Sequence, residues 1–371
     1  MMRWLWRGSL LLLPLAIAVH FLWPGNPTAV FVLSALSLMP LAKSIGDATE
    51  ELAERVGPTL GSLLNVTFGN AAELILGISA LARGHVDLVK GSLTGSIVAN
   101  LLLVGGAAIV AGGVRFPTLR FNRTSAGAHV STLFLAVVAL AVPTMLATAG
   151  QVPQRAHLLS EEISVVLIAM YALSLLFQLR THAGLLDAPA KARTPLLATP
   201  AEAAAARRPP PEREHRPLWR AVVALTLSAG ATAVASELLV GALEGTLQAV
   251  HLPETFVGVV IVAVVGNAAE HSTAVLFGRR GDMDIALGIA WESSKQIALF
   301  VAPVLVFTGL LLGAPMDLAF RPLETVAVGV AVLSTALIGL DGETHWLEGA
   351  FLLAVYAVLG LGFWFVGQSP P

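Results

Sequence analysis

The sequence GNAAE occurs twice in this chain, at residues 69–73 and again at residues 266–270, which are 197 positions apart. The same offset aligns further identical residues around the two copies: Gly61 with Gly258, Gly84 with Gly281, Asp87 with Asp284, Gly91 with Gly288, and Ser96 with Ser293. A match in one register over a stretch of this length indicates that the chain contains two related halves.

The chain around these motifs is strongly apolar. Of 371 residues, 56% are hydrophobic and 12% are charged, and the mean hydropathy is +0.79. Soluble domains carry roughly 25% charged residues, and a helix needs about 20 apolar residues to span a bilayer. We therefore predict an all-α polytopic membrane protein, with eleven apolar runs at about 10–24, 28–46, 59–82, 87–113, 125–149, 158–180, 218–246, 255–278, 284–312, 321–340 and 345–368.

The two motif copies fall in the third and the eighth of these runs. The two runs are five positions apart in this order, and because five is odd, equivalent residues cross the membrane in opposite directions. Inverted repeats of this kind recur in transporters and bring equivalent residues together near the midplane. We expect an extra N-terminal transmembrane helix in 1–27, a first five-helix repeat in 28–180, a cytoplasmic linker in 181–217, and a second five-helix repeat in 218–371.

Lys and Arg are distributed unequally over the loops. With the N-terminus in the cytoplasm, 17 of them lie on the cytoplasmic side and 3 on the opposite side. Because positive loops stay inside, we predict a cytoplasmic N-terminus and an uncleaved first span. The compact chain favours the inner membrane of a bacterium.

Several classes of protein are disfavoured by composition. Lys and Arg number 22 against 24 Asp and Glu, so no excess of positive charge points to nucleic acid. The chain has no cysteine, which excludes disulfides and thiolate metal sites. An intramembrane metalloprotease would need a second histidine four residues after the first, and NAAEH has none. We therefore expect that the protein is not an enzyme and has no resident cofactor. Its expected partner is the lipid bilayer, and the sequence leaves open whether it forms a homo-oligomer.

Glu73 and Glu270 each lie near the middle of an apolar run. A charged residue there costs about 2.5–3.5 kcal/mol on insertion scales, so an intramembrane carboxylate is a functional candidate by default. The repeat predicts that the two face each other across the axis. Such a pair can be neutralised by two protons or by one divalent cation, and competition for one site is what an exchanger requires.

Neighbouring residues suit a hard cation, since calcium takes six to eight oxygen ligands. Gly69 and Gly266 would let each helix loosen, so that backbone carbonyls join the set. For the asparagines the alternative is interhelical hydrogen bonding, and for the serines both readings stay open. Besides Glu73 and Glu270 as metal ligands, the candidates are the amides of Asn70, Asn267 and Gln296 and the hydroxyls of Ser96 and Ser293.

Other polar residues carry weaker predictions. His271 follows Glu270 and has no counterpart in the first copy, where Leu74 stands; it either relays protons or packs. Glu50 belongs to an amphipathic stretch that is either a solvated face or a cation-concentrating mouth. Glu292 and Lys295 are spaced i, i+3, which favours an ion pair on one helix face.

Several stretches together resemble the cation/proton exchangers of the calcium/cation antiporter superfamily. They are ATEEL at 48–52, GSLLNVTFGNAAE at 61–73, GSLTGSIVANLLLVGG at 91–106, GNAAEHSTAVLFG at 266–278, MDIALG at 283–288 and QIALFVAPVLV at 296–306. The resemblance implies a secondary antiporter that exchanges Ca2+ for H+ by alternating access, with Glu73 and Glu270 binding either ion. It also implies helper ligands at the amides and hydroxyls above, and His271 matches the histidine of the family.

The chain departs from the family pattern at Glu292 and Lys295, where small or neutral residues are usual, and in its basic linker. The lysine either pairs with Glu292 or repels the cation, which leaves the substrate open. The alternatives are Na+/Ca2+ exchange, exchange of H+ for another divalent cation such as Mn2+, and, in a different class, a cation channel.

Overall fold

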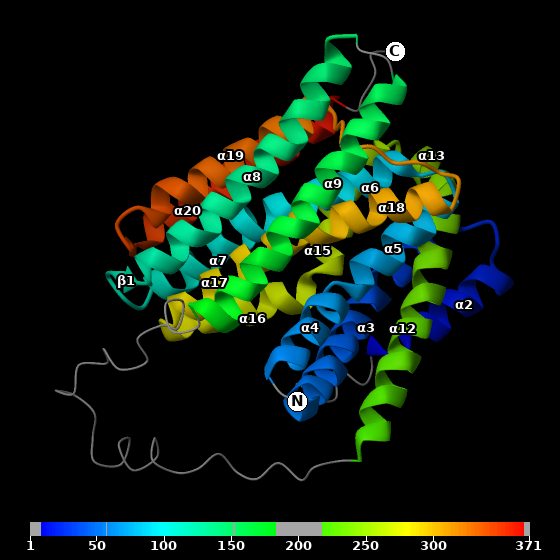
Figure 1. Ribbon diagram of the computed structural model, residues 1–371. Helices are drawn as coiled ribbons and strands as arrows, with labels where there is room; N and C mark the ends of the chain where they lie inside the picture. Colours follow the sequence, from blue (N-terminus) through cyan, green and yellow to red (C-terminus); the bar gives the residue numbers. More distant parts are fainter. Residues whose placement is uncertain (1–8, 57, 151–152, 183–216, 367–371) are drawn as a thin grey trace.

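The computed structural model describes residues 9–56, 58–150, 153–182 and 217–366. The predicted cytoplasmic linker lies outside these residues, apart from its two ends. Almost all of the described chain is helical (Figure 1). Its one sheet is a short antiparallel ribbon in which β1 (Leu119–Arg120) pairs with β2 (Glu343–Thr344), so that a loop of the first half meets a loop of the second.

The first half is a succession of apolar helices. Its elements are α2 (Leu12–Leu22), α3 (Pro27–Val56), α4 (Pro58–Gly69), α5 (Ala71–Ala82), α6 (Val86–Val98), the π-helical turn η1 (Ala99–Val104), α7 (Gly105–Gly113), α8 (Arg123–Thr148), α9 (Pro153–Leu176) and η2 (Phe177–Thr181). Local sequence sets several ends. The Asn122 side chain caps α8 by accepting from the amides of Thr124 and Ser125.

The second half repeats this order. Its elements are α12 (Leu218–Gly241), α13 (Leu243–Val250), α14 (Glu254–Phe256), η3 (Val257–Val262), α15 (Ala263–Gly266), α16 (Ala268–Arg280), α17 (Met283–Gln296), η4 (Ile297–Val301), α18 (Ala302–Leu311), α19 (Pro322–Gly339) and α20 (Trp346–Val366). Gly84 after α5 and Gly281 after α16 are equivalent in the repeat, and both adopt a positive φ, +82° and +83°. Glycine accepts this left-handed conformation without strain, which explains its presence at both ends.

Packing between the halves follows a pseudo-two-fold axis. Helix α3 lies along its equivalent α12, and α8 lies along its equivalent α19. The contacts of α7 have counterparts in those of α18, since α7 packs on α16 and α20 while α18 packs on α5 and α9. Two related halves packed in this way confirm the predicted all-helical fold of inverted repeats around a shared core.

Membrane-length helices number eight among the described residues, or nine if α13 and the helical stretch after it form one bent span. Three of the eleven predicted runs correspond to shorter or interrupted helices. Helix α2 has only 11 residues, and the runs that hold the glutamates are broken at Asn70 and at Asn267. The count of eleven therefore stays a prediction.

Two predicted boundaries differ from the structure. The run 28–46 was expected to end before the acidic stretch, yet α3 continues to Val56, because Ile45, Ala48 and Leu52 form a buried face that extends the helix. The run 218–246 is divided, since α12 ends at Gly241 and α13 begins at Leu243. Gly245 on α13 lies against Pro27, at the start of α3, with no room for a larger side chain.

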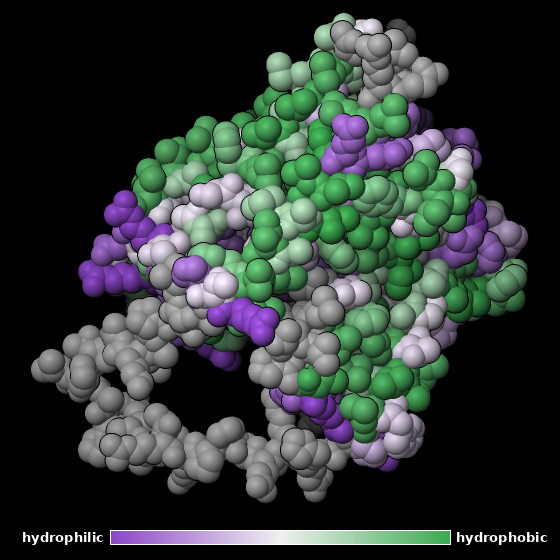
Figure 2. All heavy atoms as spheres, in the orientation of Figure 1, coloured by the Kyte–Doolittle hydropathy of each residue, from purple (hydrophilic) through white to green (hydrophobic). Residues whose placement is uncertain are grey.

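The outside of the bundle is apolar. Figure 2 shows hydrophobic side chains over most of the visible face and hydrophilic ones gathered toward its margins. Large apolar side chains such as Phe134, Leu333 and Val358 are more than half exposed. A soluble protein seldom presents so extensive an apolar surface, whereas lipid tails cover one without cost, so this surface fits a bilayer.

The core crossing of α6 with η3 depends on glycine. A Cβ atom at Gly95 would overlap the backbone of Val259, and one at Gly258 would lie 2.8 Å from the carbonyl oxygen of Leu88. The two backbones therefore touch, as in other membrane helix pairs that meet through small residues. This close approach brings the two halves together beside the two GNAAE motifs.

We expect Gly95→Ala to destabilise the protein by about 1–3 kcal/mol, because the added methyl group forces the two backbones apart. Thermal unfolding of the purified protein in detergent measures this. Gly127→Ala is the matched control, since Gly127 is a helical glycine with nothing within 4 Å of an added Cβ. Equal melting temperatures for the two variants would contradict the packing argument.

Candidate functional site

Both glutamate-bearing runs are broken one turn before the glutamate. Asn70 has φ −105° and ψ 22°, and Asn267 has φ −97° and ψ 9°, so neither residue continues its helix. Glu73 and Glu270 consequently lie in the first turns of α5 and α16. The unpaired N–H groups and the dipole of a helix N-terminus favour negative charge nearby, so each break gives its carboxylate a favourable position.

The two carboxylates come together from opposite halves. Glu73 Oε1 lies 3.8 Å from the position that a Cβ of Gly266 would take, so Glu73 sits against the break in the other repeat. Glu73 is also within electrostatic reach of Glu270. In both side chains Oε2 is buried and has no hydrogen-bond partner among the described residues. A buried oxygen without a partner is costly, and a cation or a proton would remove that cost.

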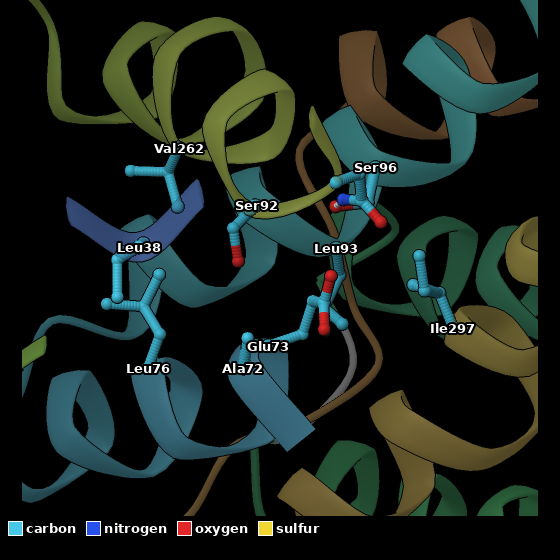
Figure 3. Close-up of a pocket in the computed structure, with 11 residues that line it drawn as sticks. Leu38, Ala72, Glu73, Leu76, Ser92, Leu93, Ser96, Val262 and Ile297 are labelled. Atoms are coloured by element: carbon cyan, nitrogen blue, oxygen red, sulfur yellow. Dashed lines mark hydrogen bonds between the residues drawn. The ribbon is translucent and has the colours of Figure 1, made fainter. Parts of the chain in front are cut away.

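A small cavity opens beside Glu73. Figure 3 shows the Glu73 side chain, on α5, reaching into it among Leu38 of α3 and Ser92 and Ser96 of α6. Asn267 and Gly266 complete the polar part of its lining. The cavity volume is about 20 Å³, which is enough for one water-sized occupant. The space therefore fits a single ion rather than an organic substrate.

Both asparagines turn their NH2 groups into the protein. Asn70 Nδ2 donates to Gln296 Oε1 at 2.5 Å. Asn267 Nδ2 donates to Ser96 Oγ and to the Ala263 carbonyl, both at 3.0 Å. Asn267 Oδ1 is buried and has no partner in the part of the chain that the structure describes. Hydrogen bonding and a ligand role, which the sequence left as alternatives, thus concern different atoms of the same amide.

A third asparagine, Asn100 on η1, joins the site and was missed by the sequence analysis. It is 1% exposed, donates from Nδ2 to Ser293 Oγ at 2.9 Å, and contacts His271 Nε2 through Oδ1 at 3.0 Å. Ser293 lies next to the Glu270 carboxylate. The sequence signal was a lone asparagine among apolar residues four positions after Ser96, which places both on one helix face.

Most predicted site residues are brought together. Glu73, Glu270, Asn267, Ser96 and Ser293 form one region with His271. Asn70 and Gln296 bond to each other at its edge, one turn before Glu73 and next to Ile297 of the cavity lining. Glu50 is exposed near the C-terminal end of α3, and among the described residues it makes no hydrogen bond or ion pair with this region. Among described residues, no three His, Cys, Asp or Glu side chains cluster in a way that could hold a metal. Any cation bound here would therefore combine two carboxylates with neutral oxygens.

The predicted ion pair of Glu292 and Lys295 is present. Lys295 Nζ lies 2.6 Å from Glu292 Oε2, and the lysine side chain is 1% exposed. His129 is buried and packs against Trp291. The pair reaches the carboxylate region through Gln296, whose Nε2 donates to Glu292 Oε1 at 3.4 Å.

Sequence comparison places this arrangement in a known family. The sodium/calcium exchanger protein family matches residues 26–180 and 220–365, which are the two repeats without the linker. The chain belongs to this family. Its members include relatives that match nearly the whole chain.

Two of these relatives and one solved structure are informative. A Ca(2+)/H(+) antiporter of Synechocystis sp. is 45% identical over 354 residues, covering 95% of each chain. A Ca(2+)/H(+) antiporter of Aphanothece halophytica is 42% identical over 361 residues, covering 96% of this chain and 95% of the relative. The structure of native YfkE superposes with a TM-score of 0.78 at 34% identity, covering 95% of this chain and 97% of that one.

Asn100→Ala should destabilise the protein by about 1–3 kcal/mol, because Ser293 and His271 lose a buried partner. Thermal unfolding in detergent measures the change. Ser131→Ala is a suitable control, since Ser131 is exposed and bonds only within its own helix. If Asn100→Ala melts at the temperature of the control, the hydrogen bonds of Asn100 do not hold the site together.

Proposed function

We propose that this protein is a secondary antiporter that exchanges Ca2+ for H+ by alternating access. The observation that carries the proposal is the pair of carboxylates, Glu73 and Glu270, whose buried Oε2 atoms lack a partner among described residues. Relatives that match nearly the whole chain are named Ca(2+)/H(+) antiporters, and a second structure of YfkE bears the name Ca2+/H+ antiporter.

The two glutamates bind either the cation or protons. Two carboxylates carry two negative charges, which one Ca2+ or two protons cancel. The occupants exclude each other because the same oxygen atoms serve both, and this exclusion couples the two fluxes. Without Ca2+ or protons, the two carboxylates stay charged in the membrane interior. Because unpaired charge there is expensive, the empty site does not change its access from one side to the other.

Neutral oxygens complete the ligand set for calcium, which prefers six to eight oxygens at 2.3–2.6 Å in general. The Oδ1 atoms of Asn70 and Asn267 and the hydroxyls of Ser96 and Ser293 are the nearest candidates. Gln296 acts on the ligand set through Asn70, because it accepts a hydrogen bond from the NH2 group of Asn70. His271 holds Asn100, and through it Ser293, so its first role here is to position a ligand.

Alternating access follows from the repeat. Equivalent helices of the two halves run in opposite directions, so one arrangement opens the site to one solution and its mirror arrangement opens it to the other. The protein resides in the inner membrane of a bacterium with its N-terminus in the cytoplasm, as the distribution of basic residues favours.

Glu73→Gln and Glu270→Gln should each abolish exchange, because the one remaining carboxylate cancels only one of the two charges of Ca2+. Proteoliposomes with an internal pH dye and an imposed proton gradient measure calcium uptake and opposite proton movement together. Glu244→Gln is the control, because Glu244 is exposed on α13. Flux that survives both site substitutions would show that the carboxylate pair is not the transport site.

The same preparation separates the alternatives. Sodium replacing H+ as the driving ion would indicate Na+/Ca2+ exchange. Manganese transported in place of calcium would change the substrate and keep the mechanism. Calcium flux that follows its own gradient and ignores the proton gradient would indicate a channel.

A further inference from the structure

The ion pair of Glu292, which is half-buried, with Lys295, which is buried, has no equivalent in the first repeat. The 197-residue offset aligns Glu292 with Gly95 and Lys295 with Val98, neither of which carries charge. The pair is well held, since Lys295 Nζ also donates to Ser174 Oγ at 3.1 Å and Glu292 Oε2 lies 3.8 Å from His129 Nδ1. The pair therefore comes from the second repeat alone, although Ser174 and His129, which contact it, belong to the first.

An ionised carboxylate dictates the orientation of an amide beside it. It can only accept hydrogen bonds, whereas an amide has a donor end and an acceptor end. Glu292 Oε1 takes the NH2 end of Gln296, so Gln296 Oε1 faces the opposite way. There it accepts from Asn70 Nδ2 at 2.5 Å. The NH2 group of Asn70 is thereby engaged, and its Oδ1 is the atom left for a cation.

The second half reaches the same result by another route. Asn267 directs its NH2 group to the Ala263 carbonyl and to Ser96 Oγ, and its Oδ1 is buried without a partner in the described part of the chain. The residue equivalent to Gln296 in the first half is Ala99, which has no amide. Two different sets of contacts thus turn both asparagines so that oxygen, the atom that calcium prefers, stays available.

We propose that Glu292 is a positioning residue for the cation site: the ion pair with Lys295 fixes the place of its carboxylate, and the carboxylate fixes the orientation of Gln296 and, through it, of Asn70. The proposal rests on the proposed function, because it concerns the oxygen ligands of the same cation. Glu292 and Lys295, which depart from the family pattern, thereby contribute to calcium binding, although Lys295 does not contact the ion.

The test is a double-mutant cycle on calcium affinity. Glu292→Gln and Lys295→Met are made together, because removing one partner alone would leave an uncompensated buried charge. An amide at position 292 can present either an oxygen or an NH2 group, so it no longer dictates the orientation of Gln296. Gln296→Leu is the second arm, and the triple variant closes the cycle. Calcium binding to the purified full-length protein in detergent gives the dissociation constants.

The paired replacement should weaken calcium binding by about tenfold to a hundredfold, the range found when outer-shell partners of metal sites are removed. In the Gln296→Leu background it should have no further effect, since Gln296 transmits the orientation. The control is Lys90→Met with Asp317→Asn, which removes another partly buried ion pair, 2.5 Å long and outside the cation site. That control should bind calcium as the wild type does.

Two results of the cycle itself would overturn the inference alone: unchanged affinity in the paired variant, or a paired effect of the same size with and without Gln296. The latter would indicate a general structural role for the ion pair. Wild-type protein that neither binds nor transports calcium would overturn the proposed function and this inference with it. Equal losses in the Lys90 control would likewise contradict a specific role for Glu292.

Discussion

Two carboxylates, each with one buried oxygen that lacks a partner among the described residues, impose the main constraint on this structure. Glu73 and Glu270 keep their Oε2 atoms buried and unsatisfied, in a surrounding where an unpaired charge is expensive. Such a pair is stable only when an ion or protons from solution neutralise it. The fold must therefore hold the two groups close enough to share an occupant and keep every permanent cation away from them. Lys295 meets this requirement, because its Nζ is paired with Glu292 Oε2 at 2.6 Å.

The backbone is adapted to the same requirement. Helix breaks at Asn70 and Asn267 place each glutamate at a helix N-terminus, and irregular backbone at this depth is tolerated where it lines a cavity. Glycines at 95 and 258 bring the halves into backbone contact beside the breaks. Since the breaks and the carboxylates recur in both halves, and the close approach joins one half to the other, the site belongs to the interface between the repeats rather than to either repeat.

Sequence patterns predicted those features that depend on residues close together in the chain. The repeated GNAAE located both glutamates and both asparagines, and i, i+3 spacing predicted the pair of Glu292 with Lys295. The patterns could not predict contacts between distant segments. Asn100 is separated from Ser293 and His271 by more than 160 positions, so its role appears only when η1 and α17 are packed together. The bond from Asn70 to Gln296 is of the same kind. Hydropathy also treated interrupted helices as continuous spans, because a break at one asparagine hardly changes the mean over a window of 20 residues.

The release of protons on calcium binding tests most directly whether the two glutamates form one shared site. Calcium would be added to the purified protein in weakly buffered detergent solution, with the proton release and the bound calcium both measured across a range of pH. Charge balance at two carboxylates predicts up to about two protons released per calcium bound at acidic pH, where both carboxylates start protonated. Glu73→Gln and Glu270→Gln should abolish both signals. Calcium that binds to the wild type with no proton release at any pH would contradict competition for one site.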